Sequence, residues 1–440
     1  HYLNKKIPRL KKYTIKTSAS ISGVLHIGRL SDTIRSESVC RALEEQGYNS
    51  EMIWVAEDMD PLRKIPEGVS GEFSKYLGMP VSEIPDPWNC HSSYAEHHVS
   101  EYLEVIDKFA DAKIEKYSMR EEYKKGNFKP YIKAILENLE KVVEIQNRYR
   151  ETPLKPGWSP WMPRCKGCGK IITPRIKEIA GSRVVYKCES YSFETSIATG
   201  CGYEGEANAL RDEGKLLWKS EWAAQWTRWK IAAEGAGKEY VVPTSAWWIN
   251  AEIAERVLDF PSPVPIFYEH LMIDGKKMSA SLGNVVYPKD WLSVAPAQLL
   301  RFFYNKKLMK TRSFSWSYLP NLYDEYDEHA RIYFEKKEDS KEIKHMRRLY
   351  EISQLGGIDK PINLPFSHAA LISQVFSDED AIVGSLRRSG HYEEKNRSLI
   401  LKRIELARRW AQKYAPEEAR ISLSADIEKI KAQLSYGQKA

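Results

Sequence analysis

The sequence predicts an α/β fold in which a parallel sheet is interrupted by an inserted module and followed by an α-helical region. Strand and helix patterns alternate over the first hundred residues and again from about 216 to 303. A proline- and tryptophan-rich stretch and four cysteines lie between these parts, and the pattern after Trp316 is mostly helical. Such alternation is typical of parallel α/β sheets. We therefore expect four segments, at residues 1–110, 111–214, 215–315 and 316–440.

Composition narrows the class of protein. The 440 residues are 42% hydrophobic and 29% charged, which supports packed cores and excludes a disordered chain. The net charge of +7 is compatible with a nucleic-acid partner but does not require one. The start of the sequence lacks the apolar run of a signal peptide, and no stretch approaches the ~18 apolar residues of a membrane span. We expect a cytoplasmic protein without membrane contact.

A strand–helix–strand unit opens the α/β pattern. "YTIKTSAS" from Tyr13 is rich in strand-forming residues. A helix follows through Leu30, Ile34 and Leu43 and closes at Gly47, and a second strand from Ser50 ends in acidic residues. Strand, helix and strand at this spacing predict two parallel neighbours in one sheet.

Three further helices follow from apolar spacing. One begins near Tyr94, and a single longer one is expected over 130–150. A third, near 397–414, carries a basic face of Lys402, Arg403, Arg408 and Arg409. This face is either solvated or in contact with RNA phosphates.

"GVLHIGRL", residues 23–30, lies between the first strand and its helix. Glycines let a backbone approach a ligand closely, and a helix N-terminus favours phosphate. His26 and Arg29 can donate to phosphate oxygens. Taken alone, a glycine turn beside a histidine is also common as plain structure.

"DGKKMSASLGN", residues 274–284, combines Lys276 and Lys277 with two serines and a glycine. A loop of this composition can close over a triphosphate and neutralise it. It can equally be a flexible surface loop.

Together, "HIGR" and "KMSAS" resemble the HIGH and KMSKS signatures of class I aminoacyl-tRNA synthetases. The segments "EDMDPLRKIPEGV", "YLGMPVSEIPDPWNCHSSYAEH", "LLWKSEWAAQW" and "NLYDEYDEHARIYF" are similar to those of the class I lysyl-tRNA synthetases, over about 13–416. The resemblance implies a split Rossmann-like (HUP-type) catalytic domain, an inserted acceptor-end module and a shortened helical domain on the anticodon side.

The resemblance also implies roles in ATP chemistry. It makes His26, Arg29, Lys277 and Ser279 the catalytic residues. ATP, with Mg²⁺, would be held by His26, Gly28, Gly237, Lys277 and Ser281. Two positions depart from the family: Arg29 stands where asparagine is frequent, and Ala280 replaces the second lysine of the loop.

For the amino acid, the resemblance points to Ser18, Ser20, Trp218, Glu221, Glu239 and Tyr240. A carboxylate such as Glu221 and an aromatic wall such as Trp218 suit an ammonium group. Trp218 is also compatible with simple core packing. Ser18 often has glycine as its counterpart, and "GKEY" at 237–240 replaces the family's GKDH-like stretch.

Cys165 and Cys168 form a Cys-x2-Cys pair with an intervening glycine, which is typical of a zinc knuckle. Cys188 and Cys201 complete the expected structural Zn²⁺ site, although Cys188 is also compatible with a small buried apolar residue. His91, His97 and His98 are suggestive of a metal cluster, but we expect ordinary surface or core histidines there.

The implied activity is ATP-dependent activation of L-lysine and its transfer to tRNA(Lys), by a monomer. Two alternatives remain from the sequence. One is a related enzyme that adenylates another amino acid or uses another acceptor. The other is an inactive zinc-ribbon RNA-binding protein.

Overall fold

The computed structural model describes residues 10–21, 25–278, 284–307, 310–335, 340–358 and 360–421. The chain forms two compact units. The first comprises residues 1–272, 276–288 and 304–313, and the second comprises 273–275, 289–303 and 314–440. Within the described ranges, no helix has both the length and the apolar character needed to span a lipid bilayer.

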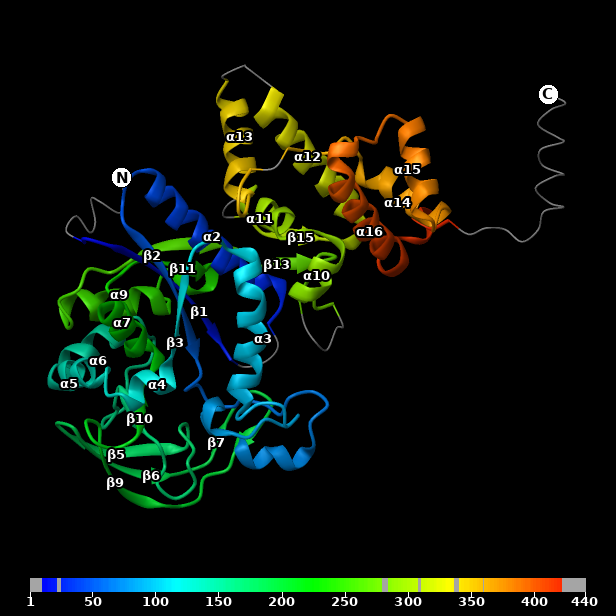
Figure 1. Ribbon diagram of the computed structural model, residues 1–440. Coiled ribbons are helices and arrows are strands. Elements are labelled where there is room, and N and C mark those ends of the chain that lie inside the picture. Colours follow the sequence, from blue (N-terminus) through cyan, green and yellow to red (C-terminus); the bar gives the residue numbers. More distant parts are fainter. Residues whose placement is uncertain are drawn as a thin grey trace. The chain divides into compact units, whose positions relative to one another are not determined.

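A five-stranded parallel sheet forms the centre of the first unit (Figure 1). Its spatial order is β12 (Val264–Tyr268), β11 (Ile231–Gly237), β1 (Tyr13–Ser20), β2 (Ser50–Glu57) and β3 (Ile114–Ser118). The chain builds outward from β1 through β2 and β3, and later returns to the other side of β1. The strand order therefore reverses between β1 and β11. The parallel α/β fold class predicted from the sequence is confirmed.

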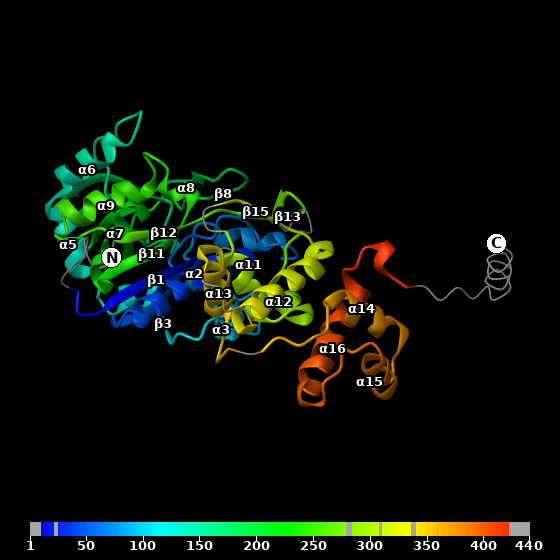
Figure 2. The same cartoon turned by 90° about the horizontal axis from the view of Figure 1, so that it is seen from above.

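Helices cover both faces of this sheet. α2 (Ile27–Glu45) and α3 (Tyr94–Phe109) lie on one side, and α7 (Trp218–Trp229) and α9 (Ala246–Arg256) lie on the other (Figure 2). The apolar side chains at the centre of β2 are buried, as expected of a strand covered on both faces. The first strand, its helix and the second strand agree with the sequence prediction.

A buried ion pair ties the sheet to α7. Lys16 Nζ of β1 lies 2.6 Å from Glu234 Oε1 of β11, and both side chains are buried. The indole N–H groups of Trp222 and Trp226 donate to Glu234 Oε2 at 2.8 and 2.5 Å. A buried charge is tolerated when it is paired and hydrogen-bonded in this way.

The helix predicted over 130–150 is broken. The structure has α5 (Lys129–Glu137) and α6 (Leu139–Arg148), with α4 (Met119–Lys124) before them. Asn138 lies between them with φ −110° and ψ 30°, and its side chain donates to the Ala134 carbonyl. An asparagine that bonds to the backbone in this way competes with helix continuation, and apolar spacing alone did not reveal it.

Short antiparallel strands make up the segment with the cysteines. β5 (Pro174–Ala180), β6 (Arg183–Cys188) and β9 (Glu204–Asn208) form one sheet. Two strand pairs accompany it: β4 (Trp161–Pro163) with β10 (Gly214–Leu216), and β7 (Tyr191–Ser192) with β8 (Ile197–Ala198). β3 belongs to the central sheet although it follows residue 110, and the four-segment division stays a prediction.

One further short helix is α8 (Lys238–Val241). A small sheet is formed by three short strands: β13 (Leu271–Ile273), β14 (Lys276–Lys277) and β15 (Arg312–Phe314). The 3₁₀ helices are η1 (Gly71–Tyr76), η2 (Val81–Glu83), η4 (Trp316–Tyr318), η5 (Glu394–Asn396) and η6 (Glu417–Ala419).

The second unit is helical. Its helices, as the structure has them, are α10 (Pro288–Val294), α11 (Ala297–Asn305), α12 (Leu319–Glu335), α13 (Lys341–Ser353), α14 (Phe366–Val375), α15 (Glu379–Arg388) and α16 (Arg397–Lys413). The basic face expected on α16 is partly internal. Arg403 pairs with Asp327, and Arg408 donates to the carbonyls of Ser373 and Phe376. These two cations stabilise helix packing and are not free for phosphate.

Candidate active site

The reversal of strand order between β1 and β11 indicates where a ligand is expected to bind. Open α/β sheets bind ligands beyond the carboxyl ends of their strands, at such a switch point. Ser18 and Ser20 end β1, and Gly237 ends β11 beside it. Three of the residues that the resemblance assigned to substrates therefore lie at one edge of the sheet.

His26 is the N-cap residue of α2, so the "HIGR" turn opens that helix. An ideal Cβ at Gly28 would lie 2.6 Å from Met278 Cε and 2.9 Å from His26 Nδ1. Only a glycine leaves this space. The Ile27 N–H also donates to the Val286 carbonyl at 2.9 Å. The two predicted signature segments thus meet at the start of α2.

The imidazole of His26 is neutral at physiological pH. Burial, and secondly the positive charge of Arg29, lower its pKa to about 4. Its Nδ1 is buried and has no hydrogen-bond partner among the described residues. A neutral imidazole can still donate one N–H to a phosphate oxygen.

Arg29 turns toward the end of β1. Its Nη1 donates to the Ser20 carbonyl, and burial lowers the pKa of the guanidinium from its usual value. The hydroxyl groups of Tyr240 and Tyr268 interact electrostatically with it. The structure therefore places this charge beside the predicted amino-acid residues.

Lys277 lies in β14 and is exposed, as is Lys276. Ser279 and Ser281, the other predicted residues of the loop, lie outside the described residues, as does Ala280. Their predicted roles stay predictions.

Aromatic rings of α7 and α8 form a cluster. Trp218 opens α7 and stacks on Trp222 with ring centroids 5.2 Å apart, and it meets Tyr240 edge to face at 5.3 Å. Trp218 remains 41% exposed, so it is not a core residue. Glu239 Oε2 lies 3.5 Å from His270 Nε2.

Glu221 is bound by this chain's own groups. Its Oε2 lies 3.0 Å from Lys215 Nζ, and its Oε1 accepts the Tyr123 hydroxyl at 2.5 Å. The carboxylate is buried, and burial raises its pKa. Both oxygens have partners and the side chain is only 1% exposed, so Glu221 is not open to an ammonium group as the sequence had led us to expect.

Three residues of the candidate site were missed by sequence reasoning. Asp60 and Lys215 form an ion pair at 2.8 Å, and Tyr268 ends β12 near Tyr240 and Arg29. The acidic end of the strand at 50–58 was visible in the sequence. Asp60 lies two residues beyond that stretch, and its pairing with a lysine 155 positions away was not visible.

The four cysteines converge as predicted. Cys165 Sγ lies 3.7 Å from Cys201 Sγ, and Cys168 Sγ lies 3.7 Å from Cys188 Sγ. All four sulfur atoms lie within 4.8 Å of one another. Tetrahedral ligands at about 2.3 Å from zinc are about 3.8 Å apart, so the donor set fits that metal. This tetrad could hold a metal ion.

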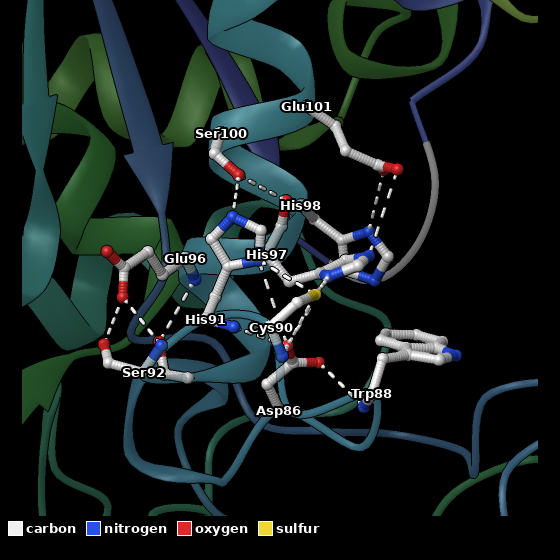
Figure 3. A network of polar contacts seen from close by, with 11 residues as sticks. Asp86, Trp88, Cys90, His91, Ser92, Glu96, His97, His98, Ser100 and Glu101 are labelled. Carbon is white, nitrogen blue, oxygen red and sulfur yellow. Dashed lines mark hydrogen bonds and ion pairs between the residues drawn. The ribbon is translucent and has the colours of Figure 1, made fainter.

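A second group of possible ligands lies before and within α3 (Figure 3). Cys90 Sγ lies 3.1 Å from His97 Nδ1, 3.2 Å from His91 Nδ1 and 3.2 Å from Asp86 Oδ2. The outer nitrogen of His91 contacts Ser100 Oγ at 2.8 Å. Metal-bound histidines are commonly oriented by such a partner.

Asp86 is ionised in this group. Its carboxylate is buried, which opposes ionisation, but the N–H groups of Trp88, Cys90 and His91 donate to it. These bonds lower its pKa to about 2. From the sequence we expected ordinary surface or core histidines here, and Asp86 and Cys90 were not connected with them; the structure instead brings His91 and His97 together with both residues.

The sequence comparisons decide the family. The model of tRNA synthetases class I (K) matches residues 2–356. The chain belongs to this family of class I tRNA synthetases. Members of this family are similar to this chain over most of their own length. The similarity is therefore not confined to the "HIGR" and "KMSAS" segments.

Three archaeal relatives illustrate this. The lysine–tRNA ligase of Methanosphaera stadtmanae is 30% identical, over 95% of this chain and 81% of that protein. Those of Pyrococcus furiosus and Aeropyrum pernix are both 33% identical over 94% of this chain, covering 79% and 77% of their own lengths. The solved arginyl-tRNA synthetase of Thermus thermophilus aligns with a TM-score of 0.35 and 14% identity over 98% of this chain and 79% of its own.

Proposed function

We propose that this class I synthetase is a lysine–tRNA ligase. The observation that carries the proposal is the contact of Met278 with Gly28 at the start of α2, beside the switch point of the sheet. The named archaeal relatives support lysine as the amino acid. As in class I synthetases generally, the nucleotide substrate is ATP.

The first step joins the amino acid to AMP. The lysine carboxylate attacks the α-phosphorus of ATP, the bond to the bridging oxygen breaks, and pyrophosphate leaves. The nucleophile is already ionised, so no protein base is needed. His26 and Lys277 would stabilise the charge that develops on phosphate, since donors fixed at such a place lower the barrier. Bound Mg²⁺ supplies further charge neutralisation.

The second step transfers the lysyl group. The 2′-hydroxyl of the terminal adenosine of tRNA attacks the acyl carbon, and AMP leaves. We assign the acceptor end to residues 111–214 and the anticodon side to residues 316–440, which the family resemblance supports.

We further propose two structural zinc ions. One is held by Cys165, Cys168, Cys188 and Cys201, whose sulfur separations fit a tetrahedral metal. The other is held by Asp86, Cys90, His91 and His97, whose donor types and separations also suit zinc. A metal in each group would cross-link the chain segments that carry its ligands.

A second candidate function follows from Arg29. A buried guanidinium beside Ser20 places positive charge near the amino-acid residues, which would disfavour a cationic substrate held in the same place. The alternative is a synthetase for a different amino acid.

Amino-acid-dependent ATP–pyrophosphate exchange, run with each of the twenty amino acids and with and without tRNA, separates the two. We expect exchange with lysine alone. Exchange with another amino acid supports the alternative, and no exchange under any condition contradicts both.

A further inference from the structure

A cluster of charged side chains lies next to the candidate amino-acid site. It consists of Glu57, Asp60, Lys215 and Glu221, which come from β2, the turn after it, β10 and α7. Lys215 Nζ bridges two of the carboxylates, at 2.8 Å from Asp60 and 3.0 Å from Glu221. One positive charge is therefore shared between two negative ones.

The cluster places three carboxyl groups around one lysine. Glu57 accepts hydrogen bonds from Gln225, and burial raises its pKa to about 8, so it is largely uncharged. Lys16, at 3.9 Å from Glu57, is neutralised by Glu234. Asp60 and Glu221 both contact the single ammonium of Lys215, and burial raises the pKa of Glu221.

Asp60 is the more exposed of the two carboxyl groups that contact Lys215. Its side chain is 26% exposed, compared with 1% for Glu221. One of its oxygens binds Lys215, and the other accepts the Ser20 hydroxyl at 3.4 Å. Asp60 also acts electrostatically on the Tyr240 hydroxyl. Its carboxylate therefore meets the end of β1 through Ser20 and interacts electrostatically with Tyr240.

Ser20 connects two groups of opposite charge. Its hydroxyl meets Asp60, and its carbonyl accepts from Arg29. An amino acid with a cationic side chain carries two groups that match these charges. Arg29 can attract its carboxylate, and Asp60 suits its terminal ammonium. The faces of Trp218 and Tyr240 add the aromatic surface that an ammonium prefers. Arg29 then serves the substrate carboxylate and does not oppose a cationic substrate.

We propose that Asp60 is the specificity-determining counter-ion for the side-chain ammonium of the substrate, and that Lys215 holds it in place while neutralising Glu221. This inference rests on the proposed function and names the residue behind its choice of amino acid. It replaces Glu221 with Asp60 as the ammonium partner.

The test compares lysine with 6-hydroxy-L-norleucine, which has the same chain length but an uncharged hydroxyl terminus. Exchange kinetics are measured for the wild type, Asp60→Asn and the control Asp107→Asn, an exposed aspartate of α3 that pairs with Lys116. Asp60→Asn keeps an oxygen for Lys215. We expect its KM for lysine to rise about 30- to 100-fold with a small change in kcat, as for the loss of a partly exposed charge partner.

The preference for lysine over the hydroxy analogue should collapse in Asp60→Asn and persist in Asp107→Asn. An unchanged preference in a folded Asp60→Asn overturns the inference. Should that variant fail to fold, Asp60→Ser is measured in the same way, because its hydroxyl still binds Lys215 without a charge. A wild type that is inactive with lysine refutes the proposed function instead.

Discussion

Gly28 shows how a single residue joins the two parts of the nucleotide site. Any side chain there would collide with Met278 or with the ring of His26. The turn and the lysine loop can therefore approach only because this position is a glycine. The sequence resemblance marks the residue, and the structure supplies the reason for it.

Lys277 is the simplest residue to test. Replacing it with alanine removes a positive charge from the loop that meets the "HIGR" turn. We expect adenylate formation to slow on the order of 100-fold, as for the loss of one strong transition-state contact. Single-turnover release of pyrophosphate measures this. Lys276→Ala, its exposed neighbour, should change the rate far less, and equal effects would argue against a specific role.

His26 should make the protein less stable in mild acid. Its pKa is about 4 when folded and about 6.5 when unfolded, so protons bind the unfolded chain preferentially. Its contribution to the free energy of unfolding is complete above pH 6.5 and falls as the pH drops toward 4. Denaturant titrations at pH 7 and pH 5 measure this loss. His26→Asn should lose less stability over that interval, and an equal loss would contradict the assigned pKa.

Sequence patterns predicted which residue types gather at the site but not how their charges pair. The resemblance pointed to Glu221 as the ammonium partner. Lys215, in a short strand just before α7, and Tyr123, 98 positions away in the sequence, occupy it instead. Local spacing carries no information about such contacts.

At the scale of elements, β11 and α2 approach each other unusually closely. An ideal Cβ at Gly235 would lie 1.5 Å from Asp32 Oδ1. We expect Gly235→Ala to lower the free energy of unfolding by about 1–3 kcal/mol or more, because the buried Asp32 must move. Gly384→Ala, in an open position of α15, is the control and should be neutral or stabilising by up to about 1 kcal/mol. Thermal or denaturant unfolding compares them, and equal effects would be contrary to the packing described.

The cysteine module should depend on its metal. Cys168→Ala removes one of the four sulfur ligands, and we expect the purified protein to hold one zinc ion per chain instead of two. His97→Ala should lose the other ion. Elemental analysis of each variant measures the content. Cys40→Ala, a buried cysteine of α2 outside both groups, should keep both ions. A wild type without zinc would rule out both sites.

The prediction of one continuous helix over 130–150 failed because a polar side chain competes with the helical backbone hydrogen bonds there. Apolar spacing continued through Asn138, but that residue separates α5 from α6. The spacing of Cys165 and Cys168 did reveal a metal-type site, because both ligands lie on one turn. The second group combines an aspartate, a cysteine and a histidine of the loop with one histidine of α3, a mixture with no familiar spacing.

At the scale of the whole molecule, the alternation of strands and helices was enough to predict the parallel sheet and the helical region. The order of strands was not predictable in the same way, because it depends on which edge the chain returns to after the cysteine module. That return places β11 beside β1 and creates the switch point. The position of the candidate site therefore depends on the strand order of the whole sheet, and no single motif determines it.

Charging of tRNA measures the proposed activity itself. Purified protein is incubated with ATP, a tRNA(Lys) transcript and each radiolabelled amino acid in turn, and label retained on the tRNA is counted. We predict that lysine is attached to tRNA(Lys), that the other amino acids are not, and that a transcript lacking the terminal adenosine accepts nothing. Attachment of a different amino acid, or none in the presence of lysine-dependent pyrophosphate exchange, would contradict the account.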